Sequence, residues 1–212
     1  MTDWDARYTE PGFAFGTEPN DFLREQAHHL PRGRVLCLAE GEGRNAVWLA
    51  AQGFAVTAVD VSRIGLDKAQ RFARERGMRI STVLCDLAAF TIEPGAWQGI
   101  VSIFAHVPAE TRRRVHAAVP VGLAPGGVLL LEGYRPAQIG RGTGGPADDA
   151  RMLDLARLRE ELPGLEWLLA RELEREVVEG RSHTGTAAVV QVVARRAGVE
   201  PLSSRGEGAR GV

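Results

Sequence analysis

The feature that most constrains this chain is a regular alternation of short apolar runs with segments of helical pattern. The apolar runs cover residues 34–39, 54–59, 79–84, 99–104 and 127–131, and helical patterns cover 45–52, 62–76 and 108–119. Runs without interleaved polar residues are typical of strands buried on both faces. Strands that alternate with helices through short loops favour a parallel sheet. We therefore predict an α/β fold with a doubly wound, mostly parallel sheet.

The pattern changes after Glu132. Residues 135–145 are rich in Gly and Arg and predict a long loop, and residues 152–162 predict a helix. Residues 165–178 and 186–194 then form two strand patterns in succession, which predicts an antiparallel hairpin on the sheet edge and seven strands in all. We expect one domain over residues 1–195, with a lid-like segment over 1–30 and a disordered tail over 196–212.

Composition excludes several classes of function. The chain is 44% hydrophobic and 25% charged with a formal net charge of −1, so no global charge attracts nucleic acid. No apolar stretch is long enough to span a bilayer. Cys37 and Cys85 lie in predicted strands, so we expect buried free thiols and, with no signal-peptide pattern, a cytoplasmic location. Monomer and homodimer both remain open.

A glycine loop between the first predicted strand and helix is the strongest local motif. Gly41 and Gly43 end the strand, and glycine lets the backbone turn sharply and a ligand approach closely. The motif alone is weak, because ordinary strand-to-helix turns contain it. Asp60, 19 residues after Gly41 at the end of the second predicted strand, strengthens it. A carboxylate there accepts from both ribose hydroxyls of a dinucleotide or of S-adenosylmethionine.

Three observations favour S-adenosylmethionine over a dinucleotide. Glu40 and Glu42 in the loop suit a cofactor with a sulfonium and an ammonium better than a pyrophosphate. Asp86 ends the third predicted strand, where an acid accepts from an adenine amino group, although an exposed loop aspartate is an equal alternative. A dinucleotide enzyme also commonly needs a second domain, for which this chain has no room.

The motif around the loop resembles that of class I S-adenosylmethionine-dependent methyltransferases. Their first motif has an acid in the strand and Gly-Cys before the glycine pair. Here Cys37 replaces the acid and Ala39-Glu40 replaces Gly-Cys. Glu40 or Glu42 then compensates for the lost contacts to the methionine part of the cofactor.

A narrower resemblance is to the tellurite-resistance and thiopurine methyltransferase-like group. It rests on residues 4–8, 15–23, 38–46 and 179–185. The resemblance implies that Arg7, Tyr8 and Gly16 close over the methionine end of the cofactor. The full set expected to bind the cofactor is Arg7, Tyr8, Gly16, Glu40, Gly41, Glu42, Gly43, Asn45, Asp60, Val61, Asp86, Leu87 and Phe104.

The chemistry implied is methyl transfer to a small molecule, a soft or anionic nucleophile such as a thiol or a selenium or tellurium compound. Such an acceptor needs little help from a general base, and the chain shows no catalytic triad and no zinc spacing. His106, at the end of the fourth predicted strand, is a candidate base or orienting group. Arg181 and His183, on which the narrower resemblance falls, are further candidates for catalysis.

The expected acceptor pocket lies among the loops after the last strands. Tyr134, Arg135, Gln138 and Arg141 lie there, and arginines suit an oxyanion or a carboxylate. Two other functions stay open. One is an NAD-dependent oxidoreductase, since the glycine loop also fits that cofactor; the other is a non-catalytic protein that binds S-adenosylmethionine or S-adenosylhomocysteine.

Overall fold

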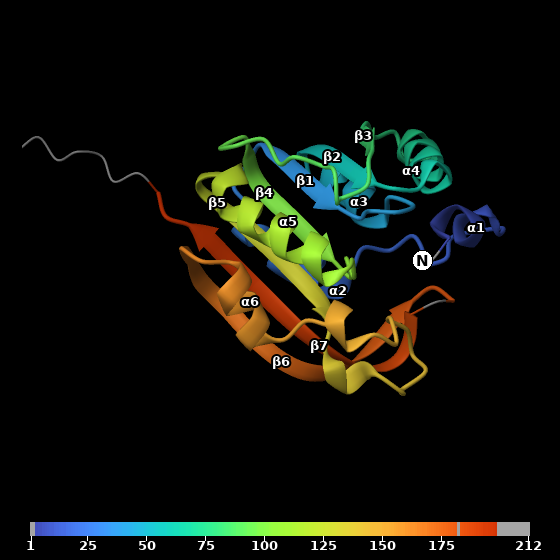
Figure 1. Cartoon of the computed structure of the whole chain (residues 1–212). Coiled ribbons are helices and arrows are strands. Elements are labelled where there is room, and N and C mark those ends of the chain that lie inside the picture. Colours follow the sequence, from blue (N-terminus) through green and yellow to red (C-terminus); the bar gives the residue numbers. More distant parts are fainter. Residues whose placement is uncertain (1–2, 182, 199–212) are drawn as a thin grey trace, which may run out of the picture.

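The computed structural model describes residues 3–181 and 183–198 as a seven-stranded sheet covered by helices (Figure 1). The strand order is β3-β2-β1-β4-β5-β7-β6. The strands are β1 (Arg34–Leu38), β2 (Ala55–Asp60), β3 (Ser81–Leu84), β4 (Trp97–Ile103), β5 (Leu123–Tyr134), β6 (Leu165–Glu179) and β7 (His183–Arg196). Strands β1 to β5 pair in parallel, whereas β7 is antiparallel to both β5 and β6. The predicted α/β sheet with its antiparallel edge hairpin is confirmed.

Two layers of helices bury the two faces of the sheet. Val35 and Cys37 of β1 point into a core with α2 (Asp21–Gln26), α3 (Arg44–Ala51) and α4 (Arg63–Glu75). Leu36 and Leu38 point the other way, into a core with α5 (Ala109–Gly122) and α6 (Leu155–Glu161). This alternation explains why the strand has no polar face. Short 3₁₀ turns lie at Ala27–His29, Pro136–Gln138 and Asp149–Arg151.

Some predicted boundaries were wrong. Helix α6 begins at Leu155 rather than at residue 152, because the side chain of Asp154 caps it by accepting from the Arg157 N–H. Before it, the N–H of Leu153 donates to the carbonyl of Tyr134, which draws that segment onto the end of β5. Strand β3 begins at Ser81, two residues late. Cys85 follows the strand and is half-buried, whereas Cys37 is buried as expected; both are free thiols.

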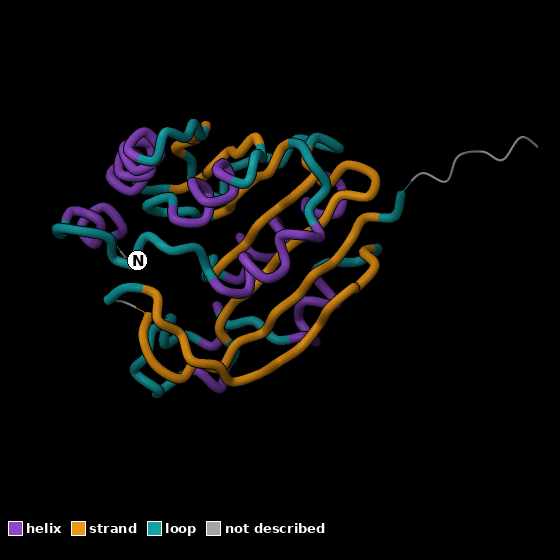
Figure 2. The backbone as a smooth tube through the Cα atoms, turned by 180° about the vertical axis from the view of Figure 1, so that it is seen from behind, coloured by secondary structure: helices purple, strands orange, loops and turns teal. Residues whose placement is uncertain are grey.

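The N-terminal segment contains a helix that its sequence pattern did not indicate, α1 (Trp4–Thr9). Asp3 caps this helix, and tertiary contacts hold it: Asp5 accepts hydrogen bonds from the Ser62 hydroxyl and the Ile64 N–H at the start of α4. The chain then runs between α4 and the β6–β7 hairpin, as Figure 2 shows from behind. The described part of the predicted lid-like segment, residues 3–30, is thus built onto the carboxyl-terminal edge of the sheet.

Two further observations concern membrane spans and the predicted C-terminal tail. No helix among the described residues has both the length and the apolar character needed to cross a membrane. The predicted tail over 196–212 lies almost wholly outside the described residues and stays a prediction.

Candidate functional site

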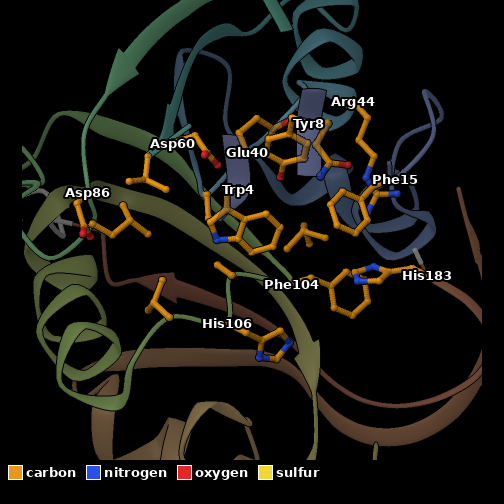
Figure 3. Close-up of a pocket in the computed structure, with 17 residues that line it drawn as sticks. Trp4, Tyr8, Phe15, Glu40, Arg44, Asp60, Asp86, Phe104, His106 and His183 are labelled. Carbon is orange, nitrogen blue, oxygen red and sulfur yellow. The ribbon is translucent and has the colours of Figure 1, made fainter. Parts of the chain in front are cut away.

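A cleft opens where β1, β2, β3 and β4 end, the edge at which open α/β sheets bind ligands (Figure 3). The space inside it, counted together with its open mouth, is about 780 Å³. The lining combines aromatic, acidic and basic side chains. It consists of Trp4, Tyr8, Phe15, Ala39, Glu40, Arg44, Asn45, Asp60, Val61, Asp86, Leu87, Ile103, Phe104, Ala105, His106, Val107 and His183.

The backbone at the cleft departs from ordinary conformations. Ala39, after β1, and Phe104, after β4, have φ of 50° and 52° and are the only non-glycine residues with positive φ within residues 3–181 and 183–198. Such conformations cost of order 1–3 kcal/mol and concentrate at functional sites. Gly41 is also required here, since a Cβ on it would lie 2.5 Å from the Tyr8 hydroxyl oxygen.

Asp60 ties the glycine loop to β2. Its Oδ2 accepts from the Gly41 N–H and its Oδ1 from the Ser62 N–H, both at 2.8 Å. Burial raises the pKa of this carboxyl, while the backbone donors oppose the rise. Each carboxylate oxygen can accept a further hydrogen bond, so Asp60 can still receive ligand hydroxyls at the cleft.

Glu40 follows Ala39 in the dipeptide that replaces Gly-Cys of the resembled motif. Its Oε1 accepts from the N–H of Ala46 in the first turn of α3 at 2.7 Å. Burial raises the pKa of Glu40 to about 7, despite the backbone bonds and the nearby Arg44. A cation in the cleft would draw this carboxyl into its ionised form.

Aromatic rings cover the cleft. Trp4 stacks on Tyr8 with ring centroids 5.7 Å apart, and Phe15 meets the edge of Tyr8 at 6.3 Å. Phe15 and Phe104 also contact the His183 ring, at 4.6 and 4.9 Å. Trp4 and Phe15 both lie in the N-terminal aromatic segment, whose sequence shows no helical periodicity.

A buried ionic cluster beside the cleft was not foreseen. Glu132 accepts from the Arg175 guanidinium at 2.8 Å, and Asn20 Nδ2 donates to both Glu132, at 2.6 Å, and Glu179, at 2.8 Å. Arg44 Nη2 donates to Glu179 Oε2 at 2.5 Å. The only sequence signal was Glu132 itself, a lone acid at the end of an apolar run.

The ionic cluster keeps Glu179 charged. Burial opposes ionisation of this carboxyl, but His183, Arg44 and Arg175 outweigh it and lower its pKa to about 2. His183 Nδ1 lies 3.8 Å from Glu179 Oε2 and, among the described residues, has no hydrogen-bond partner. Burial nevertheless lowers the pKa of His183, against the pull of Glu179.

His106 lines the cleft, but both ring nitrogens are engaged. Nδ1 lies 3.0 Å from the Arg151 carbonyl, and Nε2 accepts from the Tyr134 N–H at 3.0 Å. This pairing places the proton on Nδ1. Burial lowers the pKa of His106 to about 4. The geometry therefore leaves no nitrogen for proton abstraction, and the ring instead holds the loop after β4 against the end of β5.

Several residues expected at the site serve other contacts. Glu42 is buried, accepts from the Ala14 N–H at 2.7 Å and pairs with Lys68 at 2.8 Å. Arg181 Nη1 donates to the Pro11 carbonyl at 2.8 Å. Gly16 packs against Gly180, Gln138 accepts from the Ala188 N–H, Arg135 pairs with Glu172, and Arg141 pairs with Glu174 on the surface. None of these side chains lines the cleft in the described part of the chain.

Of the remaining expected residues, Gly41 and Gly43 turn the loop and Asn45, Val61, Asp86 and Leu87 line the cleft. Tyr134 is buried beneath it, against the rings of Phe104 and His183. Arg7 lies outside the cleft, over the ring of Trp4 at 5.3 Å.

A second cavity adjoins the first and shares Trp4, His106 and His183 with it. Arg7, from α1, and Arg151, from the turn before α6, line it together with the backbone-rich stretch 144–146. The loop after β5 therefore contributes to the site, through residues other than those expected. Within the described residues no group of three or more His, Cys, Asp or Glu side chains is arranged to hold a metal ion.

Comparison with known proteins finds a methyltransferase match over part of the chain. Residues 35–127 match a family model described as a methyltransferase domain. The curated 2-heptyl-1-hydroxyquinolin-4(1H)-one methyltransferase of Mycobacteroides abscessus is 24% identical over 124 residues, which is 57% of this chain. The match spans about half of that relative, 55% of its length.

Solved structures share the fold. A structure from work on the conversion of a disulfide bond into a thioacetal group during echinomycin biosynthesis superposes with a TM-score of 0.72 at 21% identity, covering 93% of this chain and 91% of the other. TehB from Haemophilus influenzae gives 0.69 at 18% identity, covering 91% and 65%.

Proposed function

We propose that this chain, a class I S-adenosylmethionine-dependent methyltransferase by its domain and fold, methylates a small-molecule acceptor that arrives already ionised. The acceptor is a soft or anionic nucleophile, such as a thiolate or a selenium or tellurium compound. The observation that carries the proposal is the pair of adjoining cavities: an acid-lined cleft for the cofactor and a neighbouring cavity lined by two arginines.

The first cleft fits S-adenosylmethionine in chemistry. Asp60 accepts from the ribose hydroxyls, and Val61, Leu87 and Phe104 offer apolar surface to the adenine. Glu40 is near the sulfonium and ammonium charges. The cofactor supplies an activated methyl group; the chain binds, orients and excludes water with the cover of Trp4, Tyr8 and Phe15.

The structure also weighs against a dinucleotide. The N–H groups of Gly41 and Ala46, at the turn where a pyrophosphate would bind, already donate to Asp60 and Glu40. Two carboxylates at that turn would repel the phosphates. This arrangement favours the methyltransferase over the NAD-dependent oxidoreductase.

The second cavity favours an anionic acceptor. Arg7 and Arg151 supply its charge, and Trp4 an aromatic wall. His106 has no free nitrogen, and burial lowers the pKa of His183, so neither offers a strong base. An acceptor that is ionised in solution needs none, because its lone pair is already available for in-line attack on the methyl group.

The experiment is a titration followed by a methyl-transfer screen. S-adenosylhomocysteine and NAD are titrated separately by calorimetry; binding of NAD alone would refute the methyltransferase. Labelled methyl transfer is then measured to thiols, selenite, tellurite, thiopurines and 2-heptyl-1-hydroxyquinolin-4(1H)-one. Cofactor binding without transfer to any ionisable acceptor would instead support a non-catalytic binding protein.

An Arg151→Gln variant tests the acceptor pocket. We expect a higher KM for an anionic acceptor and an unchanged affinity for S-adenosylhomocysteine, since Arg151 does not line the cofactor cleft. Arg159→Gln, on the outer surface of α6 over the Trp167 ring, is the matched control. Equal KM values in the two variants would remove the anionic-acceptor argument.

A further inference from the structure

The inference starts from Arg44, a basic residue in the first turn of α3 that borders the cleft. Its side chain is only 9% exposed. Nη2 donates to Glu179 at 2.5 Å, but Nη1 is buried and has no hydrogen-bond partner anywhere in residues 3–181 and 183–198. A buried guanidinium N–H without an acceptor is costly, and such groups are rare unless a ligand or water pairs them.

The charges of the cleft are separated along its length. Asp86 and Asp60 lie toward one end in Figure 3, and Arg44 lies at the other with Phe15 and His183. Arg44 is the one guanidinium among the described lining residues of this cleft. A ligand with hydroxyls at one end and a carboxylate at the other would match this arrangement in one orientation only.

We propose that Arg44 Nη1 binds the carboxylate of the amino-acid part of S-adenosylmethionine. The proposal rests on the proposed function, because it assigns a contact within the same cofactor cleft. Adenosine then lies toward Asp60 and Asp86, and the amino-acid end lies under Phe15, beside the ionic cluster. The lost acid of the resembled first motif, where Cys37 now stands, is not needed for this contact.

The ionic cluster acts as the positioning device. Glu179 fixes one edge of the Arg44 guanidinium, and Asn20 and Arg175 in turn hold Glu179, at 2.8 and 3.3 Å. A guanidinium held on one edge presents its remaining N–H groups in a fixed direction, which suits a planar carboxylate. Glu179 of β6 thereby contributes to cofactor binding through Arg44.

Arg7 is the competing candidate, since the family resemblance assigns it to the methionine end. Its guanidinium lies 5.3 Å from the Trp4 ring centroid and borders the second cavity rather than the cleft. If Arg44 binds the carboxylate, variants of Arg44 lose the ability to recognise it. If Arg7 binds it, a variant of Arg7 does.

The test removes either the carboxylate from the ligand or the guanidinium from the site. S-adenosylhomocysteine and its decarboxylated analogue are titrated by calorimetry into the full chain, as wild type, Arg44→Gln, Arg44→Lys, Arg7→Gln and Arg71→Gln. Arg71→Gln is the control, because Arg71 is an exposed arginine on α4 that belongs neither to the cleft lining nor to the ionic cluster. Circular dichroism and thermal melts establish that each variant is folded.

We expect decarboxylation to weaken wild-type binding about 10- to 100-fold, the range for a hydrogen-bonded charged pair. In Arg44→Gln the same change should cost less than about 3-fold, whereas Arg71→Gln should discriminate as wild type does. Arg44→Lys should retain part of the discrimination, and it alone tests the proposal if Arg44→Gln does not fold.

Two results would overturn the inference. Full discrimination in Arg44→Gln and Arg44→Lys would exclude the contact, and its loss in Arg7→Gln would assign the carboxylate to Arg7. A wild-type chain that binds S-adenosylhomocysteine but ignores decarboxylation also refutes the contact and leaves the proposed function standing. A wild-type chain that binds neither ligand refutes both.

Discussion

Replacement of Asp60 by alanine tests two roles of this carboxylate: binding of the cofactor, and hydrogen bonding to the backbone of the glycine loop. The variant removes the carboxylate assigned to the ribose hydroxyls. Hydrogen bonds to a charged acceptor are worth about 1.5–3 kcal/mol, so we expect the Kd for S-adenosylhomocysteine to rise roughly 10- to 150-fold.

The same substitution should also destabilise the fold. The Asp60 side chain accepts from the N–H groups of Gly41 and Ser62 at 2.8 Å, and both donors lie in the buried turn region. A buried donor left without a partner costs about 1–3 kcal/mol, so a fall in Tm is expected even without ligand. Loss of the Gly41 bond also frees the loop that passes beneath Tyr8.

Calorimetric titration measures the first effect and a thermal melt the second. Asp67→Ala is the control, because Asp67 is exposed on α4 and does not line the cleft. A folded Asp60→Ala protein with wild-type affinity would refute the ribose assignment. A variant that keeps both affinity and Tm would refute the account of the loop as well.

Three further predictions concern neighbouring residues. Since burial raises the pKa of Glu40 to about 7, and a bound cation favours its ionised form, the affinity for S-adenosylmethionine should rise between about pH 6 and pH 8; Glu40→Gln should flatten this dependence in a titration series. Gly43→Ala, whose Cβ would lie 2.6 Å from a side-chain atom of α4, should lose about 2 kcal/mol more stability in urea unfolding than Gly77→Ala, which has a similar φ but open space. Arg181→Ala should speed hydrogen exchange in residues 4–16 and leave the acceptor KM unchanged, because its guanidinium holds that segment; a raised KM without faster exchange would restore a direct role.

The sequence alone determined the architecture of this protein. Apolar runs without a polar face indicated strands covered on both sides, and their alternation with helices predicted the parallel part of the sheet. The change of pattern after Glu132 likewise predicted the terminal hairpin. The glycine loop and Asp60 belong to one short strand-helix-strand unit. Their proximity in the fold could therefore be predicted from the local sequence pattern.

Tertiary structure decided the rest, because the remaining contacts join residues far apart in the chain. The ionic cluster unites Asn20, Arg44, Glu132, Arg175 and Glu179 from separate elements, and no local pattern encodes such pairing. Long-range contacts also explain why His106 and Arg181 do not have the catalytic roles expected from the sequence. Whether an imidazole is free or a guanidinium is already paired depends on backbone groups that only packing brings within hydrogen-bonding distance.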